Sequence, residues 1–307
     1  MTFSFLFNLA AKEDNFRWQD AAGEVDGFPF SKAFIDSIKN EHLSAKTARS
    51  SHYIEKELLS QSETLIYEVQ WGPIKAGYLI LSASPRSPNG QIRLGAKLLS
   101  NNYVSSIFKI RDYIISWVDA KELYPLFFEQ HTREGKYKKD EYVIYDTMGE
   151  RIIAGGKKSL KEIKAPPFTH DFISALYYTR SMELKPGDTF TINTFVDYKI
   201  YPIKLKVKSK ETVKVNAGKF KCVLIEPKLV GDGDRLNKHD KLEIWISDDE
   251  HRVPVMAKSK VKVGSVTAKL VRISRHKTLV EDEDYQRPQE SHQNDANYLQ
   301  EHVNDLL

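Results

Sequence analysis

Short segments of alternating apolar and polar residues, separated by turn residues, run through most of this 307-residue chain. In one of them, Tyr67, Val69 and Trp71 alternate with charged or polar neighbours before Gly72 and Pro73 end the run. A period of two is the spacing of a β-strand, because successive side chains point to opposite faces of the sheet. Turn residues recur about every 8–12 residues, which is typical of an antiparallel meander. The expected strands are 65–71, 74–84, 91–99, 112–118, 126–132, 141–145, 151–154, 189–196, 203–209, 211–215, 222–229, 241–246, 253–263 and 265–273.

Two stretches, 101–109 and 169–181, have helical spacing instead. In the second, Phe172, Ala175 and Leu176 share one face, and Thr169 or Asp171 can cap the start. The sequence therefore predicts a mainly all-β fold, a curved antiparallel sheet or incomplete barrel of about a dozen strands with one or two short packed helices. No repeat with a period of about 20–50 residues is present, which argues against a propeller or solenoid.

The two ends of the chain differ from the β-rich part, which is expected to span residues 62–275. Residues 1–11 are apolar and end in small residues, like the second half of a secretory signal, although no basic residue precedes Lys12. The alternative is an apolar segment that packs on the body. Residues 12–61 are predicted to form a partly helical arm. Residues 276–307 are predicted to form an acidic, mobile tail.

Basic residues gather on particular strands of the body. Lys204 and Lys206, and likewise Lys258 and Lys260, recur every second residue, which places each pair on one face of a strand. Such a face could attract lipid headgroups or an envelope polysaccharide, or it could be a solvated face that protects strand edges. The lysines are not interleaved with stacking aromatic residues, and no DNA- or RNA-binding motif is present. We therefore expect no nucleic-acid partner.

Candidate sites for chemistry are few. His170 and Asp171 lie at a predicted helix start with Ser174 one turn later, but this spacing prevents the Asp from reaching behind the imidazole ring, as a triad requires. The segment 232–240 alternates oxygen ligands but lacks the glycine and final Glu of a calcium loop. The single Cys222 excludes an intrachain disulfide and predicts a small buried side chain. We expect no catalytic, cofactor-binding or metal-binding residue.

Two segments, 67–81 and 242–255, resemble the exported bacterial proteins of the domain-of-unknown-function 3108 family. The resemblance covers residues 62–274. The blocks that carry it are Trp71-Gly72, Ala76-Gly77, His170-Asp171, Ser174-Ala175-Leu176, Gly187-Asp188 and the segment from Trp245 to Val255. It implies a periplasmic or otherwise exported protein, with these blocks as turns and core anchors, and it brings no catalytic residues.

Several expectations follow for individual residues. Trp71 and Trp245 should anchor the core, Gly77 should mark a bulge or tight bend, and His170 should flank the helix start. We expect a monomeric, non-enzymatic binder or carrier of an apolar or lipid-like ligand, peripheral to a membrane at most, because no apolar run approaches the about 18–20 residues of a membrane helix. The alternatives are an assembly protein that docks on an envelope partner, or a hydrolase acting through His170 and Asp171.

Overall fold

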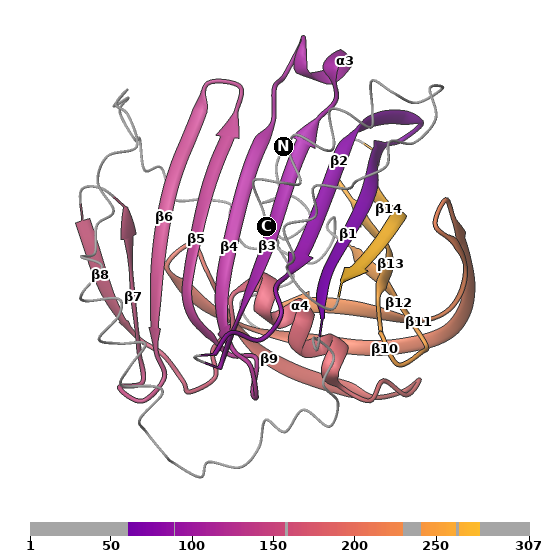
Figure 1. Ribbon diagram of the computed structural model, residues 1–307. Helices are drawn as coiled ribbons and strands as arrows, with labels where there is room; N and C mark the ends of the chain where they lie inside the picture. The colour runs from indigo at the N-terminus through magenta and orange to yellow at the C-terminus, as the bar shows by residue number, and fades with distance from the viewer. Residues whose placement is uncertain (1–60, 89, 157–158, 230–240, 262–263, 277–307) are drawn as a thin grey trace.

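The computed structural model describes residues 61–88, 90–156, 159–229, 241–261 and 264–276, which form one large antiparallel sheet (Figure 1). The first set of strands is β1 (Ser62–Trp71), β2 (Ile74–Ala83), β3 (Gln91–Ser100), β4 (Arg111–Asp119), β5 (Pro125–Glu134), β6 (Tyr137–Asp146), β7 (Arg151–Gly156) and β8 (Ser159–Lys164). The second set is β9 (Thr189–Val196), β10 (Lys199–Val215), β11 (Gly218–Leu229), β12 (Leu242–Ser247), β13 (Pro254–Lys260) and β14 (Ser265–His276). The described helices are α3 (Asn102–Ser105) and α4 (Phe172–Ser181). The predicted fold class is confirmed.

The order of the strands divides the sheet into two meanders that meet in the middle. Strands β1 to β8 run outward one after another to one edge, and β14 back to β9 run outward to the other. The two meanders are joined where β1 pairs with β14, from Ser62 opposite His276 to Trp71 opposite Val266. Helix α4 lies in the chain between the two edge strands β8 and β9. Because these strands lie at opposite edges of the sheet, the chain returns across it, and α4 lies on the concave side (Figure 1).

The main core forms where the concave face of the sheet meets α4. Leu65, Tyr67 and Val69 of β1 alternate toward this side, as their period of two predicts, and they pack in one cluster with Ile173 and Tyr177 of α4. The helix also contacts β3, β4 and β9. We call this concave side the inner face and the opposite side the outer face.

The β1–β2 pairing contains a bulge next to Gly77. Val69 lies opposite Gly77, but Gln70 lies opposite Lys75, so Ala76 is the extra residue. A Cβ atom on Gly77 would lie 1.9 Å from the backbone oxygen of Leu99 on β3. The prediction of a bulge at this glycine is confirmed, and the neighbouring backbone explains why no larger residue fits.

We expect Gly77→Ala to destabilise the protein by about 1–3 kcal/mol, because β2 and β3 would have to separate to admit the methyl group. Gly72→Ala is the matched comparison. A Cβ at Gly72 would have nothing within 4 Å, although its φ of 55° favours glycine. Urea denaturation of both variants measures the difference. An unchanged free energy of unfolding for Gly77→Ala would contradict the close approach.

Several local predictions need correction. The helix expected over 101–109 is confined to the four residues of α3, which follow the Asn101 cap. Tyr103 and Ile107, which were expected on one side of this helix, are exposed. The strands expected over 203–209 and 211–215 form one strand, β10, with a register shift between Val207 and Ser209. Strand β8 was not expected, because its sequence is short and mostly charged or polar.

Some predictions fall outside the described residues. These are the signal-like segment 1–11, all of the arm except Gln61, the 232–240 loop and all of the tail except His276. Over the described part of the chain, no helix combines the length and hydrophobicity needed to cross a bilayer.

Candidate functional site

The start of α4 is attached to the first meander through Asp171. Its Oδ1 accepts hydrogen bonds from the backbone N–H groups of Ile173 (2.8 Å) and Ser174 (2.9 Å), so Asp171 is the cap, one of the two predicted residues. Its Oδ2 accepts a 2.6 Å hydrogen bond from Ser116 Oγ on β4. Burial raises the pKa of the Asp171 carboxyl, although these hydrogen bonds oppose the shift.

His170 attaches the same helix start to β9. Its backbone N–H donates to Asn193 O (2.8 Å), and its carbonyl accepts from Phe195 N (2.7 Å). Its ring stacks on Tyr178, with 4.9 Å between the ring centroids, and Nδ1 lies 3.1 Å from Ser174 Oγ. The side chain is fully buried, so His170 is a packed core residue and does more than flank the helix.

The end of α4 carries a buried ion pair that the sequence did not reveal. Arg180 Nη1 lies 2.8 Å from Glu63 Oε1, and Nη2 lies 3.1 Å from Oε2, with both side chains almost fully buried. Arg275 of β14 donates to the same carboxylate at 2.9 Å. Burial alone would raise the pKa of Glu63, but the two guanidinium groups hold it below its usual value.

Further contacts fix the guanidinium of Arg180 in place. Its Nε donates to Arg252 O (2.9 Å), and Nη2 also donates to His251 O (3.1 Å), both in the turn before β13. The guanidinium lies 4.7 Å from the ring centroid of Tyr177. Together with Asp171 and His170, Arg180 holds α4 at both ends.

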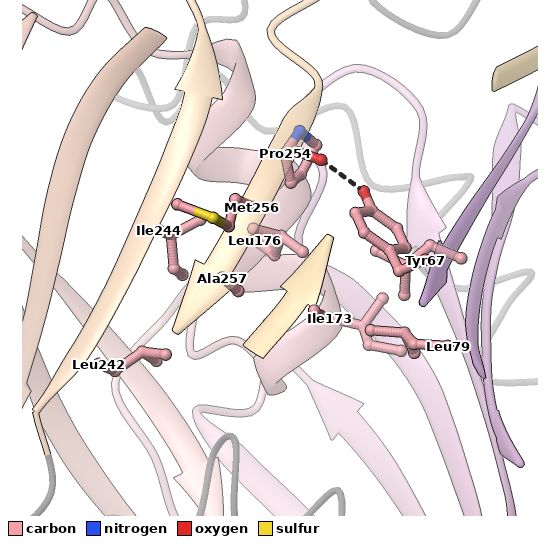
Figure 2. A pocket seen from close by; sticks show the side chains of 11 residues that line it. Tyr67, Leu79, Ile173, Leu176, Leu242, Ile244, Pro254, Met256 and Ala257 are labelled. Carbon is pink, nitrogen blue, oxygen red and sulfur yellow. Dashed lines mark hydrogen bonds between the residues drawn. The ribbon is translucent and has the colours of Figure 1, made fainter. Parts of the chain in front are cut away.

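Between these fixed ends, α4 leaves an apolar groove against the second meander. One cavity of about 40 Å³ lies between α4 and strands β1, β2 and β12 to β14 (Figure 2). A second cavity of about 60 Å³ lies between α4 and strands β9 to β12. Both cavities are lined by Leu176, Leu242 and Ile244. The two cavities are therefore adjoining parts of one groove, on either side of Leu176.

The groove wall is almost entirely apolar. Ile173 and Leu176 approach it from the helix, and Ile244, Met256 and Ala257 approach it from β12 and β13 (Figure 2). The hydroxyl of Tyr67 donates to Pro254 O at 2.7 Å, so this polar group is satisfied at the edge of the groove. No ionisable carboxyl, amine or imidazole lines either cavity. Such a surface can bind apolar groups.

The two tryptophans predicted as anchors have different environments. Trp245 is buried with Val213, Leu224 and Val255, as predicted. The prediction for Trp71 is wrong, because 39% of its surface is exposed. It is the last residue of β1, next to the β1–β2 turn.

The lysine strands are less cationic than the sequence suggests. Lys206 pairs in register with Glu226, whose carboxylate also lies 3.6 Å from Lys208. Lys258 pairs in register with Glu243. Lys204 lies opposite Lys228, and Lys260 opposite Ser265. The four predicted lysines thus lie on paired strands of the second meander, interspersed with carboxylates. Within the described ranges, no group of three or more His, Cys, Asp or Glu side chains could hold a metal ion.

Comparisons with solved structures give similarity of fold. The β-barrel-like protein of domain of unknown function DUF1849 from Brucella abortus has 9% sequence identity and a TM-score of 0.50, over 72% of this chain and 100% of that chain. The hypothetical protein CT021 from Chlamydia trachomatis has 7% identity and a TM-score of 0.33, over 81% and 97%. A Bacteroides fragilis protein with a YmcC-like fold, provisionally described as exported, has 12% identity and a TM-score of 0.27, over 74% and 100%.

The comparison with protein families is more specific. No curated protein matches the chain. The model of a family described as "Protein of unknown function (DUF3108)" matches residues 66–271, which include the whole of α4 and all of the sheet except the start of β1 and the end of β14. The resemblance inferred from the Tyr67 and Trp245 segments is confirmed. The chain belongs to the DUF3108 family of proteins of unknown function.

Proposed function

We propose that the protein is an exported, non-enzymatic carrier that binds an apolar or lipid-like ligand between α4 and the second meander. The observation that carries this proposal is the pair of adjoining apolar cavities around Leu176, with no carboxyl, amine or imidazole group in their walls. An apolar groove of this kind gains binding free energy from the area that it removes from water.

The groove must widen to take such a ligand. An apolar cavity of about 150 Å³ can hold a benzene ring, whereas the two parts measure about 40 and 60 Å³. Rotation of the Leu176 side chain away from Leu242 and Ile244 would join them. The polar contacts at both ends of α4 lie outside these cavity walls, so the helix can keep its place while the groove opens.

The surroundings of His170 support a role other than hydrolysis. His170 and Ser174 are both fully buried, and a hydrolytic nucleophile needs access to its substrate. The Asp171 carboxylate bonds to Ser116 and to backbone N–H groups, and His170 Nδ1 faces Ser174 instead. These contacts suit a fixed helix start.

Export is supported by the apolar segment 1–11, which ends in small residues like the second half of a secretory signal. N-terminal sequencing of the native protein from fractionated cells tests it. We expect a periplasmic or otherwise exported product that begins near residue 12. An intact chain found only in the cytosol would contradict export.

Ala257→Leu is expected to reduce ligand binding, because the larger side chain fills the groove next to Ile244 and Met256. The matched control is Thr267→Leu, which adds a leucine on the neighbouring strand β14. Thr267 lies opposite Lys258 and precedes the groove residue Ala268, so its side chain points to the outer face. Native mass spectrometry and extraction of lipid from freshly purified protein measure the bound material.

We expect bound apolar material in the parent and in the Thr267→Leu variant, and markedly less in Ala257→Leu. Equal amounts in all three proteins would place the ligand elsewhere. Parent protein that carries no apolar material, and takes up none from added fatty acid, would overturn the carrier proposal.

A further inference from the structure

One end of the first meander carries exposed apolar side chains on three neighbouring loops. The β1–β2, β3–β4 and β5–β6 connections, with α3 in the second, lie at the same end of the sheet (Figure 1). Their exposed large apolar residues are Trp71, Ile74, Tyr103, Ile107, Phe108 and Tyr137. We call residues 71–75, 101–109 and 135–138 the tip surface. Single exposed apolar residues are ordinary, but a group of six at one end of a protein indicates an interaction site.

Hydrogen bonds join the three loops into one surface. Asn101 Nδ2 donates to Lys75 O at 2.7 Å, which connects the start of α3 to the β1–β2 loop. The backbone N–H of Gly135 donates to Lys109 O at 2.8 Å, which connects the β5–β6 turn to the end of the β3–β4 loop. A Cβ on Gly135 would lie 2.9 Å from the ring of Phe108, so these two loops also pack closely. The apolar side chains are therefore held on a continuous base.

The charge of the tip surface has one sign. It contains Lys75, Lys109, Lys136 and Lys138 and no Asp or Glu. Lys75 is paired with Glu68 on β1 at 3.3 Å, and the other three lysines are exposed. The most exposed apolar side chains lie among them, since Ile107 is 79% and Tyr103 is 69% exposed.

We infer that the tip surface docks the protein on an anionic lipid bilayer. Aromatic side chains prefer the boundary between lipid headgroups and acyl chains, and isoleucine gains free energy by entering the apolar layer. Lysines beside them attract anionic headgroups, each strengthening binding about fivefold near such a surface. Exposed apolar groups mark protein and membrane contacts alike, but the single sign of charge on all three loops favours a uniformly anionic surface such as a bilayer with anionic headgroups. The lysine strands of β10 and β13 lack this combination, because Glu226 and Glu243 lie among them.

The test is co-sedimentation of the full chain with vesicles of phosphatidylcholine, with and without phosphatidylglycerol. We expect binding to the anionic vesicles, weakened by added salt. Lys109→Ser with Lys136→Ser should weaken binding to the anionic vesicles about 25-fold, and Tyr103→Ser with Ile107→Ser should abolish it. The matched controls are Lys258→Ser with Lys260→Ser, and Leu160→Ser at the exposed edge strand β8, which should bind like the parent.

Binding that is lost in the Lys258 and Lys260 control, and kept in both tip variants, would assign the membrane surface to the lysine strands and overturn the inference. So would a parent protein that binds anionic vesicles no better than neutral ones. Circular dichroism shows that each variant is folded. The groove variant Ala257→Leu should bind vesicles like the parent, so the result is independent of the proposed ligand.

Discussion

Glu63→Gln is expected to lower the free energy of unfolding by about 3–5 kcal/mol, because it leaves the buried guanidinium of Arg180 without its counter-charge. Arg180 is 1% exposed, and its remaining partners are the carbonyls of the turn before β13 and the ring of Tyr177. The pair also connects the end of α4 to β1 and, through Arg275, to β14. Urea denaturation of the variant and the parent measures the loss.

The control is Glu183→Gln, which removes the exposed Glu183–Lys185 pair and should leave stability unchanged. Parent-like stability of Glu63→Gln would show that the buried pair is not needed.

The same pair makes stability depend on acid. The pKa of Glu63 is lowered in the folded state, so its contribution is complete above the unfolded value of about 4.3 and is lost as pH falls through the folded value. The pKa of Asp171 is raised in the folded state, so protonation of this carboxyl favours folding as pH falls, which is the opposite of the effect at Glu63. We therefore expect Glu63→Gln to show a smaller loss of stability below pH 4.3 than the parent.

Trp245→Ala should cost about 3–5 kcal/mol, and Trp71→Ala no more than about 1–2 kcal/mol. Trp245 is 7% exposed, and its indole N–H donates to Glu211 Oε2 at 3.0 Å. Truncation would leave a cavity among Leu224, Val213 and Val255. Trp71 is at the end of its strand, where solvent can fill the space.

Chemical denaturation of the two alanine variants and of Trp245→Phe orders these effects. The phenylalanine variant should be intermediate, because it restores most of the packing but not the hydrogen bond. Equal losses for Trp71→Ala and Trp245→Ala would show that Trp71 is a core residue after all, and its part in the tip surface would have to be withdrawn.

The strands were predictable because period-two alternation depends on local sequence. The inner face of β1 could be assigned from Tyr67 and its neighbours, and the bulge from a glycine inside an apolar run. The cap at Asp171 was predictable for the same reason, since a cap acts within a few residues of its own position. The continuity of β10 and the length of α3 were less predictable, because a bulge and a single helical turn leave almost no periodic signal.

The groove and the ion pair could not be predicted, because both depend on which strands become neighbours. Glu63 and Arg180 are 117 positions apart, and neither has a local partner that marks it. The sequence around Leu176 predicts an apolar helix face, but it does not indicate that Leu242 and Ile244 lie opposite this residue. The tip surface was missed for a related reason. Its aromatic residues belong to three loops, and a prediction of burial from strand pattern alone assigned Trp71 to the core.

The β1–β14 seam also fixes when the domain can become complete during its synthesis. Every other strand pair joins consecutive strands, so each meander can form from local hairpins, but the seam joins residues that are 195 (Trp71 and Val266) to 214 (Ser62 and His276) positions apart. Non-local pairings of this kind slow folding, because a long loop must close before they form. The hydrogen-bonding edge of β1 that pairs with β14 therefore stays unpaired until β14 has been synthesised. A chain that crosses a membrane from its N-terminus would depend on a chaperone to shield that edge during the interval.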